Sequence, residues 1–229
     1  VELRSPFDPA NMGLWCARQV STRYKDRADS IAKVSDLLAV MAAAQPGHYL
    51  AFFPSYSYLQ QVWEDFAARY PDQPTLCQES SMDEGQRTEF LAQFLARDGK
   101  PLLGFAVLGG VFGEGVDLTG ESLIGVAVVS PGLPQIGPRQ EQLRDYFEET
   151  RGAGFDYAYR YPGMNKVLQA AGRVIRTPQD RGVVLLIDDR FLAPDTRRLM
   201  PPHWEHLRVV DSADAWKDEL AAFWKNHES

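Results

Sequence analysis

Three polar side chains at a helical spacing could bind an anion. Gln169, Arg173 and Arg176 follow one another at intervals of four and three residues. On a helix that turns about 100° per residue, they fall within an arc of roughly 60°. Guanidinium groups held side by side repel each other unless an anion lies between them, and their planar forks match a phosphate. The spacing therefore predicts a phosphate-binding helix face; a solvated surface helix is the alternative.

The helix that must carry these side chains is predicted over 164–176. Its apolar residues lie on the side away from the arginines, which is typical of a helix docked on a core. They are Met164, Val167, Leu168, Ala171, Val174 and Ile175. Pro178 predicts the end of the helix, because a proline disfavours helical geometry in the residue before it.

Two other stretches could approach a ligand. The predicted strand 48–53 closes at Pro54, and Ser55 and Tyr56 then open a helix. Helix N-termini bind anions readily, although a serine there is also an ordinary N-cap. The loop 109–117 carries four glycines directly after an apolar run. Such a loop can bring backbone close to a ligand. It is not a Walker loop, because no Lys-Ser or Lys-Thr follows, and an empty glycine-rich turn is the alternative.

The composition limits the class of protein. With 229 residues and 45% apolar content, the chain can build one large or two small domains. It contains no apolar run of membrane-spanning length, and its N-terminus lacks a signal pattern. A first residue other than Met leads us to expect a fragment. With only two cysteines, Cys16 and Cys77, this chain cannot hold a four-cysteine cluster. So few cysteines favour an intracellular, reducing environment. A net charge of −7 disfavours bulk coating of nucleic acid but not a local basic groove.

Apolar runs predict strands that alternate with helices along the chain. The predicted strands are 12–20, 48–53, a short one within 71–77, 101–108, 123–130, 182–187 and 206–210. The predicted helices are 28–44, 56–70, 82–97, 139–151, 164–176 and 213–224. Unbroken apolar strands between helices indicate an α/β domain with a mainly parallel sheet covered on both faces.

Ligands of such sheets lie beyond the carboxyl ends of the strands. We therefore expect Ser55, Tyr56, the loop 109–117 and the arginine helix to border one crevice. The charged stretch 23–27, which contains one tyrosine, is predicted to be a solvated connector. The Gly- and Tyr-rich stretch 152–162 is predicted to be a loop; its tyrosines either pack or border a ligand path.

Three motifs carry a resemblance to a known family. They are Phe-Phe-Pro-Ser-Tyr at 52–56, Gly-Glu-Gly-Val-Asp at 113–117 and Gln-Ala-Ala-Gly-Arg-Val-Ile-Arg at 169–176. In order and spacing they resemble motifs IV, V and VI of superfamily 2 helicases, most closely the XPD/DinG group of iron–sulfur DNA helicases. The opening Ser5-Pro6-Phe7 and the later Asp189-Arg190-Phe191 also fit this group, so the resemblance covers nearly the whole chain.

The resemblance implies that residues 1–229 form the second RecA-like motor domain of such a helicase. The first motor domain, the iron–sulfur region with its 4Fe-4S cluster and the arch would be absent. ATP and Mg²⁺ would bind between the two motor domains. Arg173 and Arg176 would act as arginine fingers on the γ-phosphate, and Gln169 would position the nucleotide.

The other motifs receive nucleotide- and DNA-linked roles from the same resemblance. Glu114, Gly115 and Asp117 would link the nucleotide to DNA, with Asp117 near the ribose. Gly113, through the backbone of its loop, would contact the translocating single strand. Ser55 and Tyr56 would contact the same strand.

The expected function is half of an ATP-dependent DNA helicase that acts in DNA repair and is inactive alone. The resemblance implies 5′-to-3′ movement. The expected partners are single-stranded DNA and the first motor domain, with no membrane, and the expected form is a monomer at the bacterial nucleoid in the cytoplasm. A stand-alone RecA-like module that binds nucleic acid or protein without catalysis is the alternative. A dinucleotide-binding enzyme is disfavoured, because the glycine loop lacks that fingerprint.

Overall fold

A seven-stranded parallel sheet organises the chain in the computed structural model, which describes residues 7–95, 101–110 and 123–226. Gly113, Glu114, Gly115 and Asp117, like Ser5 and Pro6, lie outside the described residues. The strand order is β3-β4-β2-β5-β6-β1-β7, and every neighbouring pair is parallel. The strands are β1 (Met12–Ala17), β2 (His48–Phe53), β3 (Thr75–Cys77), β4 (Leu102–Val107), β5 (Gly125–Val129), β6 (Gly182–Ile187) and β7 (Arg208–Val210). The predicted α/β class is confirmed.

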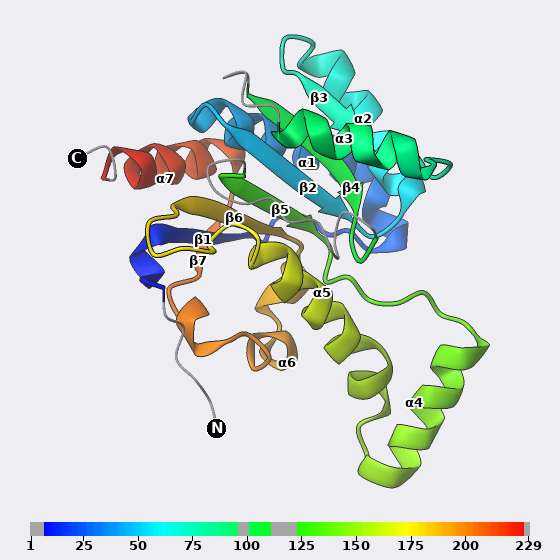
Figure 1. Ribbon diagram of the computed structural model, residues 1–229. Helices are drawn as coiled ribbons and strands as arrows, with labels where there is room; N and C mark the ends of the chain where they lie inside the picture. Colours follow the sequence, from blue (N-terminus) through cyan, green and yellow to red (C-terminus); the bar gives the residue numbers. More distant parts are fainter. Residues whose placement is uncertain (1–6, 96–100, 111–122, 227–229) are drawn as a thin grey trace.

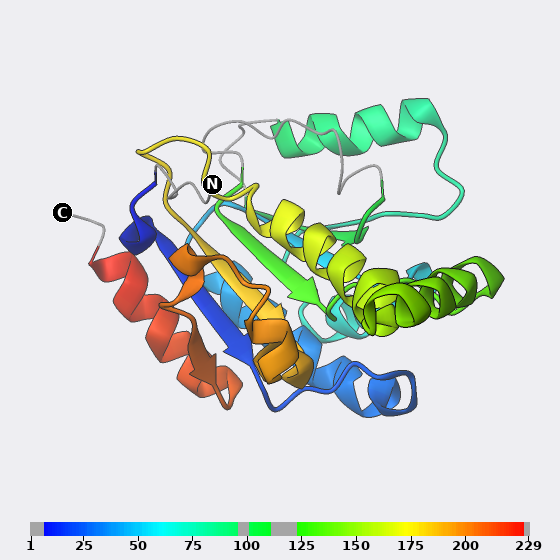
Figure 2. The same ribbon diagram turned by 90° about the horizontal axis from the view of Figure 1, so that it is seen from below.

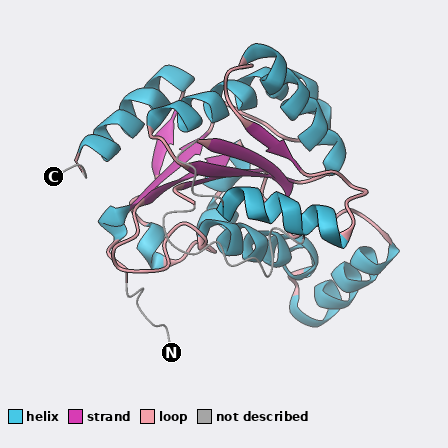
Figure 3. Cartoon of the chain, turned by 45° about the horizontal axis from the view of Figure 1, so that its top comes forward, coloured by secondary structure: helices cyan, strands magenta, loops and turns pink. Residues whose placement is uncertain are grey.

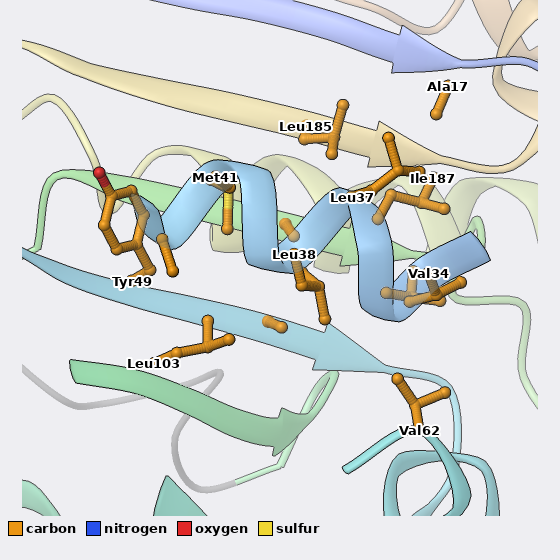
Figure 4. Close-up of a cluster of buried hydrophobic side chains, with 14 of the residues drawn as sticks. Ala17, Val34, Leu37, Leu38, Met41, Tyr49, Val62, Leu103, Leu185 and Ile187 are labelled. Carbon is orange, nitrogen blue, oxygen red and sulfur yellow. The ribbon is translucent and has the colours of Figure 1, made fainter. Parts of the chain in front are cut away.

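Helices cover both faces of this sheet (Figure 3). They are α1 (Arg27–Ala44), α2 (Tyr56–Arg69), α3 (Glu84–Leu95), α4 (Pro138–Arg151), α5 (Tyr161–Ala171), α6 (Pro194–Arg197) and α7 (Ala213–Lys225). The core on one face is built by α1, α2 and α7, and the other by α3, α5 and the turns after β6. In the first core, Leu37 and Met41 of α1 belong to the same buried cluster as Leu185 of β6 (Figure 4).

Burial on both faces explains why these strands read as unbroken apolar runs. Every residue of β1, β2, β5 and β6 is buried, so no polar side is left to produce an alternating pattern. β7 lies at one edge of the sheet, with Val209 41% exposed. The sheet is thus a rigid platform. A site can be positioned either at the amino ends of its strands or at their carboxyl ends.

The stretch 152–162 is not the predicted loop. Gly152 ends α4 in a left-handed conformation with φ 62°, and a π-helical turn, η4 (Asp156–Arg160), leads directly into α5. Pro162 follows this π-helical turn, in the first turn of α5. The Phe147 and Tyr157 rings stack at 4.3 Å, so aromatic packing between α4 and η4 replaces the expected loop.

The α4–η4 hairpin extends away from the sheet (Figures 1 and 2). None of the 14 residues of α4, all of which the structure describes, is buried. The apolar side chains of α4 therefore cover no core, and Tyr146 is 61% exposed. Asp156 anchors the hairpin instead, by ion pairs to Arg160 and, at 2.6 Å, to Arg198.

Candidate functional site

Ser55 and Tyr56 lie at the carboxyl end of β2, as predicted. Ser55 is the N-cap of α2 with an extended backbone, and its hydroxyl accepts a hydrogen bond from the Tyr58 N–H at 3.4 Å. Tyr56 is 38% exposed, and its hydroxyl accepts a hydrogen bond from the Gln78 amide at 3.0 Å. The pair therefore offers an exposed ring and a capped helix start at this edge of the sheet.

Gln78 is a buried amide that the sequence analysis missed. Its side-chain oxygen accepts a hydrogen bond from the Val107 N–H at 2.8 Å, while its nitrogen donates to Tyr56. Its own backbone N–H donates to the Phe105 carbonyl at 2.8 Å. One side chain thus ties Tyr56 to the last residue of β4, directly before the glycine loop. In the sequence, Gln78 is only a polar residue after a short strand, a pattern that predicts a turn and no particular function.

The structure describes the start of the glycine loop, residues 109 and 110, but not motif V at 113–117. Gly109 adopts a left-handed backbone with φ 73°, and a Cβ there would lie 2.8 Å from side-chain carbons of Lys166 on α5. The left-handed conformation therefore requires glycine at this position, whereas the flexible end of the Lys166 side chain can shift away from a Cβ. The proposed roles of the later loop residues remain predictions, because those residues lie outside the described ranges.

A buried carboxylate joins the ends of β1 and β6 at the same edge. Asp188 is 0% exposed and accepts hydrogen bonds from the Thr22 N–H at 2.8 Å and from the Arg190 Nε at 2.7 Å. Arg190 also donates to Ser130, whose φ of 88° is rare outside glycine, at the end of β5. Burial opposes ionisation of Asp188, but hydrogen bonds and charge from Arg190, together with Thr22, outweigh it and lower its pKa.

The arginine segment differs from the predicted helix. α5 ends at Ala171, with Gly172 as its C-cap, so Arg173 and Arg176 lie beyond the helix. The N–H of Arg173 bonds the Ala170 carbonyl at 3.3 Å, in a tighter turn. Gln169 is exposed, Arg173 is 8% exposed and Arg176 is half-buried. The prediction of one helix face that carries all three side chains is therefore wrong.

The helix ends earlier than predicted because the apolar pattern of the sequence continues past its last residue. Val174 and Ile175 are buried at 3% and 8% exposure, but a turn delivers them to the core. Gly172, which has a low helix propensity, marks the true end. The predicted end of the helix at residue 176 is five residues too late, because the buried residues have the spacing of a helix.

The arginine segment also lies at the opposite edge of the sheet from Ser55 and Tyr56. The Asn11 side chain, beside the start of β1, donates to the Pro178 carbonyl at 3.0 Å. In Figure 1 the yellow loop before β6 lies at the amino ends of the strands, whereas α2 begins at their carboxyl ends. A strand of six residues is roughly 20 Å long, so the predicted single crevice is wrong. A helix that connects parallel strands must return the chain to the amino edge.

Asp180 fixes the backbone of Arg176. Its carboxylate accepts hydrogen bonds from the N–H groups of Arg176 at 2.8 Å and of Thr177 at 2.7 Å. Burial opposes ionisation of Asp180, but these bonds and the charge of Arg176 outweigh it and lower the pKa. The backbone of Arg176, a half-buried residue, is therefore held in a fixed turn, and a fixed backbone favours anion recognition.

The residues present fit only part of a nucleotide–metal site. Among residues 7–95, 101–110 and 123–226, no group of three His, Cys, Asp or Glu side chains is placed to hold a metal ion. Burial raises the pKa of the Cys16 and Cys77 thiols to about 12, so neither is a thiolate at neutral pH. Arginine and amide groups can contact a nucleotide from this side, whereas the described residues offer no set of ligands for a metal ion or cluster.

Comparison with known proteins gives a consistent family. The family model described as "Helicase C-terminal domain" matches residues 38–207. Regulator of telomere elongation helicase 1 of Bos taurus is 30% identical over 223 residues, covering 89% of this chain and 18% of that protein. The helicase subunit XPD of general transcription and DNA repair factor IIH from Schizosaccharomyces pombe is 27% identical over 213 residues, covering 85% and 26%. This chain thus spans less than a third of either relative.

Solved structures agree on the fold. A structure named XPD_APO superposes with a TM-score of 0.71 at 17% identity, covering 87% of this chain and 40% of that one. The C-terminal domain of the DEAD-box protein Dbp5 gives a TM-score of 0.54 at 14% identity, covering 95% and 98%. The predicted RecA-like architecture is confirmed. Within the described part of the chain, no helix combines the length and the apolarity that a bilayer crossing needs. Both relatives are eukaryotic, so a bacterial source remains a prediction.

Proposed function

Because this chain belongs to the helicase C-terminal domain family, in the XPD/DinG group of superfamily 2, we propose that residues 1–229 are the second motor domain of an ATP-dependent DNA helicase. The observation that carries the proposal is the family match over 38–207, which includes both the arginine segment and the Ser55–Tyr56 turn. The full-length protein would act in DNA repair, move 5′ to 3′ and hold an iron–sulfur cluster outside this chain.

At the amino edge of the sheet, this domain would contribute positive charge to a nucleotide held by the first motor domain. ATP with Mg²⁺ would supply the phosphoryl group that is transferred to water. Arg176, fixed through its backbone by Asp180, would stabilise charge on that group, assisted by Arg173 and by the exposed Gln169. These residues supply no metal ligand, which is consistent with a shared site between two domains.

At the carboxyl edge, the same domain would hold single-stranded DNA. Tyr56 presents a partly exposed ring, and Ser55 begins a helix of 14 residues whose first N–H groups face a phosphate favourably. The nucleotide and the strand would therefore bind at opposite ends of one rigid sheet. Closure of the two motor domains on ATP would then shift the DNA-holding edge relative to the first domain.

The first test is the activity of this chain alone. The purified 229-residue domain is expected to hydrolyse no ATP above the buffer blank, with or without single-stranded DNA, because it supplies only one side of the site. The full-length protein, assayed in parallel, is expected to turn over ATP with stimulation by single-stranded DNA. Turnover by the isolated domain would overturn the half-motor proposal. A full-length protein that binds DNA without any turnover would instead favour a binding module.

Gln78 gives a second test, of the DNA-holding edge. In the full-length protein, Gln78→Ala is expected to weaken single-strand binding about fivefold, because the Tyr56 hydroxyl and the end of β4 lose their shared partner. Tyr56→Phe removes only the hydroxyl, so Gln78→Ala should add much less in that background. The Kd values of the four proteins form a double-mutant cycle. Strictly additive effects would show that Gln78 does not act through Tyr56.

A further inference from the structure

Tyr24 is an aromatic residue with a highly exposed side chain. At 88% it is the most exposed large hydrophobic side chain in the part of the chain that the structure describes. It begins a short turn, η2 (Tyr24–Asp26), that joins the carboxyl end of β1 to α1. The stretch 23–27 is thus a connector, as predicted, but its one aromatic ring packs against no core. A single exposed aromatic ring is ordinary on a protein surface, so the neighbours of Tyr24 must show whether it meets a ligand.

Arg27 lies against the Tyr24 ring and links it to Tyr58 of α2. The Arg27 guanidinium carbon lies 5.6 Å from the centre of the Tyr24 ring and 5.0 Å from that of Tyr58. Tyr58 is buried, and its hydroxyl lies 2.6 Å from the Ser30 hydroxyl, so the second ring is a fixed support. One side of Tyr24 therefore rests on a positioned cation, while most of the ring is open to solvent.

Only some of the basic residues around Tyr24 are neutralised by an ion pair. Arg23 is paired with Asp189 at 2.6 Å. For Lys25 and Arg27, by contrast, no ion pair is present among the described residues. Asp26, whose carboxylate accepts the Ser21 hydroxyl at 2.6 Å, and Asp29 keep the surroundings from being strongly basic. Such a surface suits a ligand that offers a flat ring as well as a negative charge.

The place of Tyr24 in the fold indicates which ligand this is. Tyr58, which Arg27 contacts, lies in the first turn of α2, the helix that Ser55 caps. The first turns of α1 and α2 lie at the same end of the sheet, because α1 follows β1 and α2 follows β2 and these strands are parallel (Figure 1). A strand held at Ser55 and Tyr56 would therefore pass close to Tyr24.

We propose that Tyr24, supported by Arg27, is a stacking platform for one base of single-stranded DNA, with Lys25 and Arg27 facing the adjacent phosphates. This inference rests on the proposed function. Base–aromatic stacking accepts any base, so the platform would hold the strand without reading its sequence. It extends the DNA-holding edge from the start of α2 to the start of α1, across the ends of two strands.

The test uses the full-length protein with Tyr24→Ala and Tyr24→Phe. Fluorescence anisotropy measures Kd for a labelled oligothymidine and for a strand of equal length in which abasic sites replace the bases. Tyr24→Ala is expected to raise Kd for the normal strand roughly tenfold, whereas Tyr24→Phe, which keeps the ring, stays within about twofold. On the abasic strand, Tyr24→Ala and wild type should bind alike. Thermal melting confirms that both variants are folded, as expected for so exposed a position.

Three outcomes separate this inference from its premise. An unchanged Kd for Tyr24→Ala on the normal strand would overturn the platform while leaving the helicase proposal intact. An equal loss on the normal and abasic strands would also overturn it, because the ring would then contact the backbone. A wild-type protein that binds neither strand would refute the proposed DNA-holding edge itself, and the platform with it.

Discussion

Replacement of Arg176 by alanine in the full-length protein is expected to lower ATP turnover by about a thousandfold or more. An arginine finger stabilises charge on the transferred phosphoryl group, and its removal costs about three to five powers of ten. Arg176 suits this role better than Arg173, because the residue is only half-buried and its backbone is fixed by Asp180. Arg173, at 8% exposure, is more closely packed, so its substitution would mix loss of stability with loss of catalysis.

The matched variants separate charge from geometry. Arg176→Lys keeps a positive charge but loses the planar fork, so most of the loss should remain. Arg18→Ala removes an exposed arginine that is paired with Asp211 at the carboxyl edge, and turnover should not change. Steady-state kinetics with saturating single-stranded DNA provides kcat and KM for each protein. If Arg176→Ala keeps turnover within about threefold of wild type, this arginine is not a finger.

The sheet could be predicted from sequence because burial on both faces leaves a direct imprint. Every strand of the central four is an unbroken apolar run, and a helix follows each in the chain order that a parallel sheet requires. Helix ends were harder to predict. Val174 and Ile175 are buried by a turn, yet their spacing is that of a helix, and only Gly172 marked the difference.

The edge at which each motif lies follows from topology rather than from residue type. A motif that precedes a strand in a parallel sheet lies at the amino edge, and one that follows a strand lies at the carboxyl edge. Arg176 precedes β6, whereas Ser55 follows β2. The order of elements in the sequence therefore determines the edge of each motif, and the rule that ligands lie beyond the carboxyl ends of strands holds only for motifs that follow a strand.

Contacts between distant residues could not be predicted at all. Gln78 reaches Tyr56 across 22 positions, and Arg27 reaches Tyr58 across 31. Neither spacing follows a helix or strand period, so only the folded sheet brings these residues together. The parts of the site that sequence reasoning missed are therefore those that join two strand ends.

Asp188→Ala is expected to lower the free energy of unfolding of the 229-residue domain by about 3 to 5 kcal/mol at pH 7. Removing one partner of a buried, hydrogen-bonded ion pair leaves the other uncompensated. Here Arg190 would lose the Asp188 carboxylate as its partner, and the Thr22 N–H and hydroxyl would lose their acceptor. Asp211→Ala is the control, because the Arg18–Asp211 pair is about 60% exposed and such pairs contribute no more than about 1 kcal/mol. Urea denaturation of the three proteins measures the differences.

The pH dependence provides the decisive check, because it identifies the charge itself. The native pKa of Asp188 is lowered, so its contribution is complete above the unfolded value of about 3.9 and is lost as the pH falls through the native pKa. The gap between wild type and Asp188→Ala should therefore stay constant from pH 7 to pH 5 and shrink below about pH 4. A gap that persists unchanged into strong acid would mean that the methyl-for-carboxyl exchange removes packing rather than charge. The joined ends of β1 and β6 would then depend on shape, and the carboxyl edge would hold its position without the ion pair.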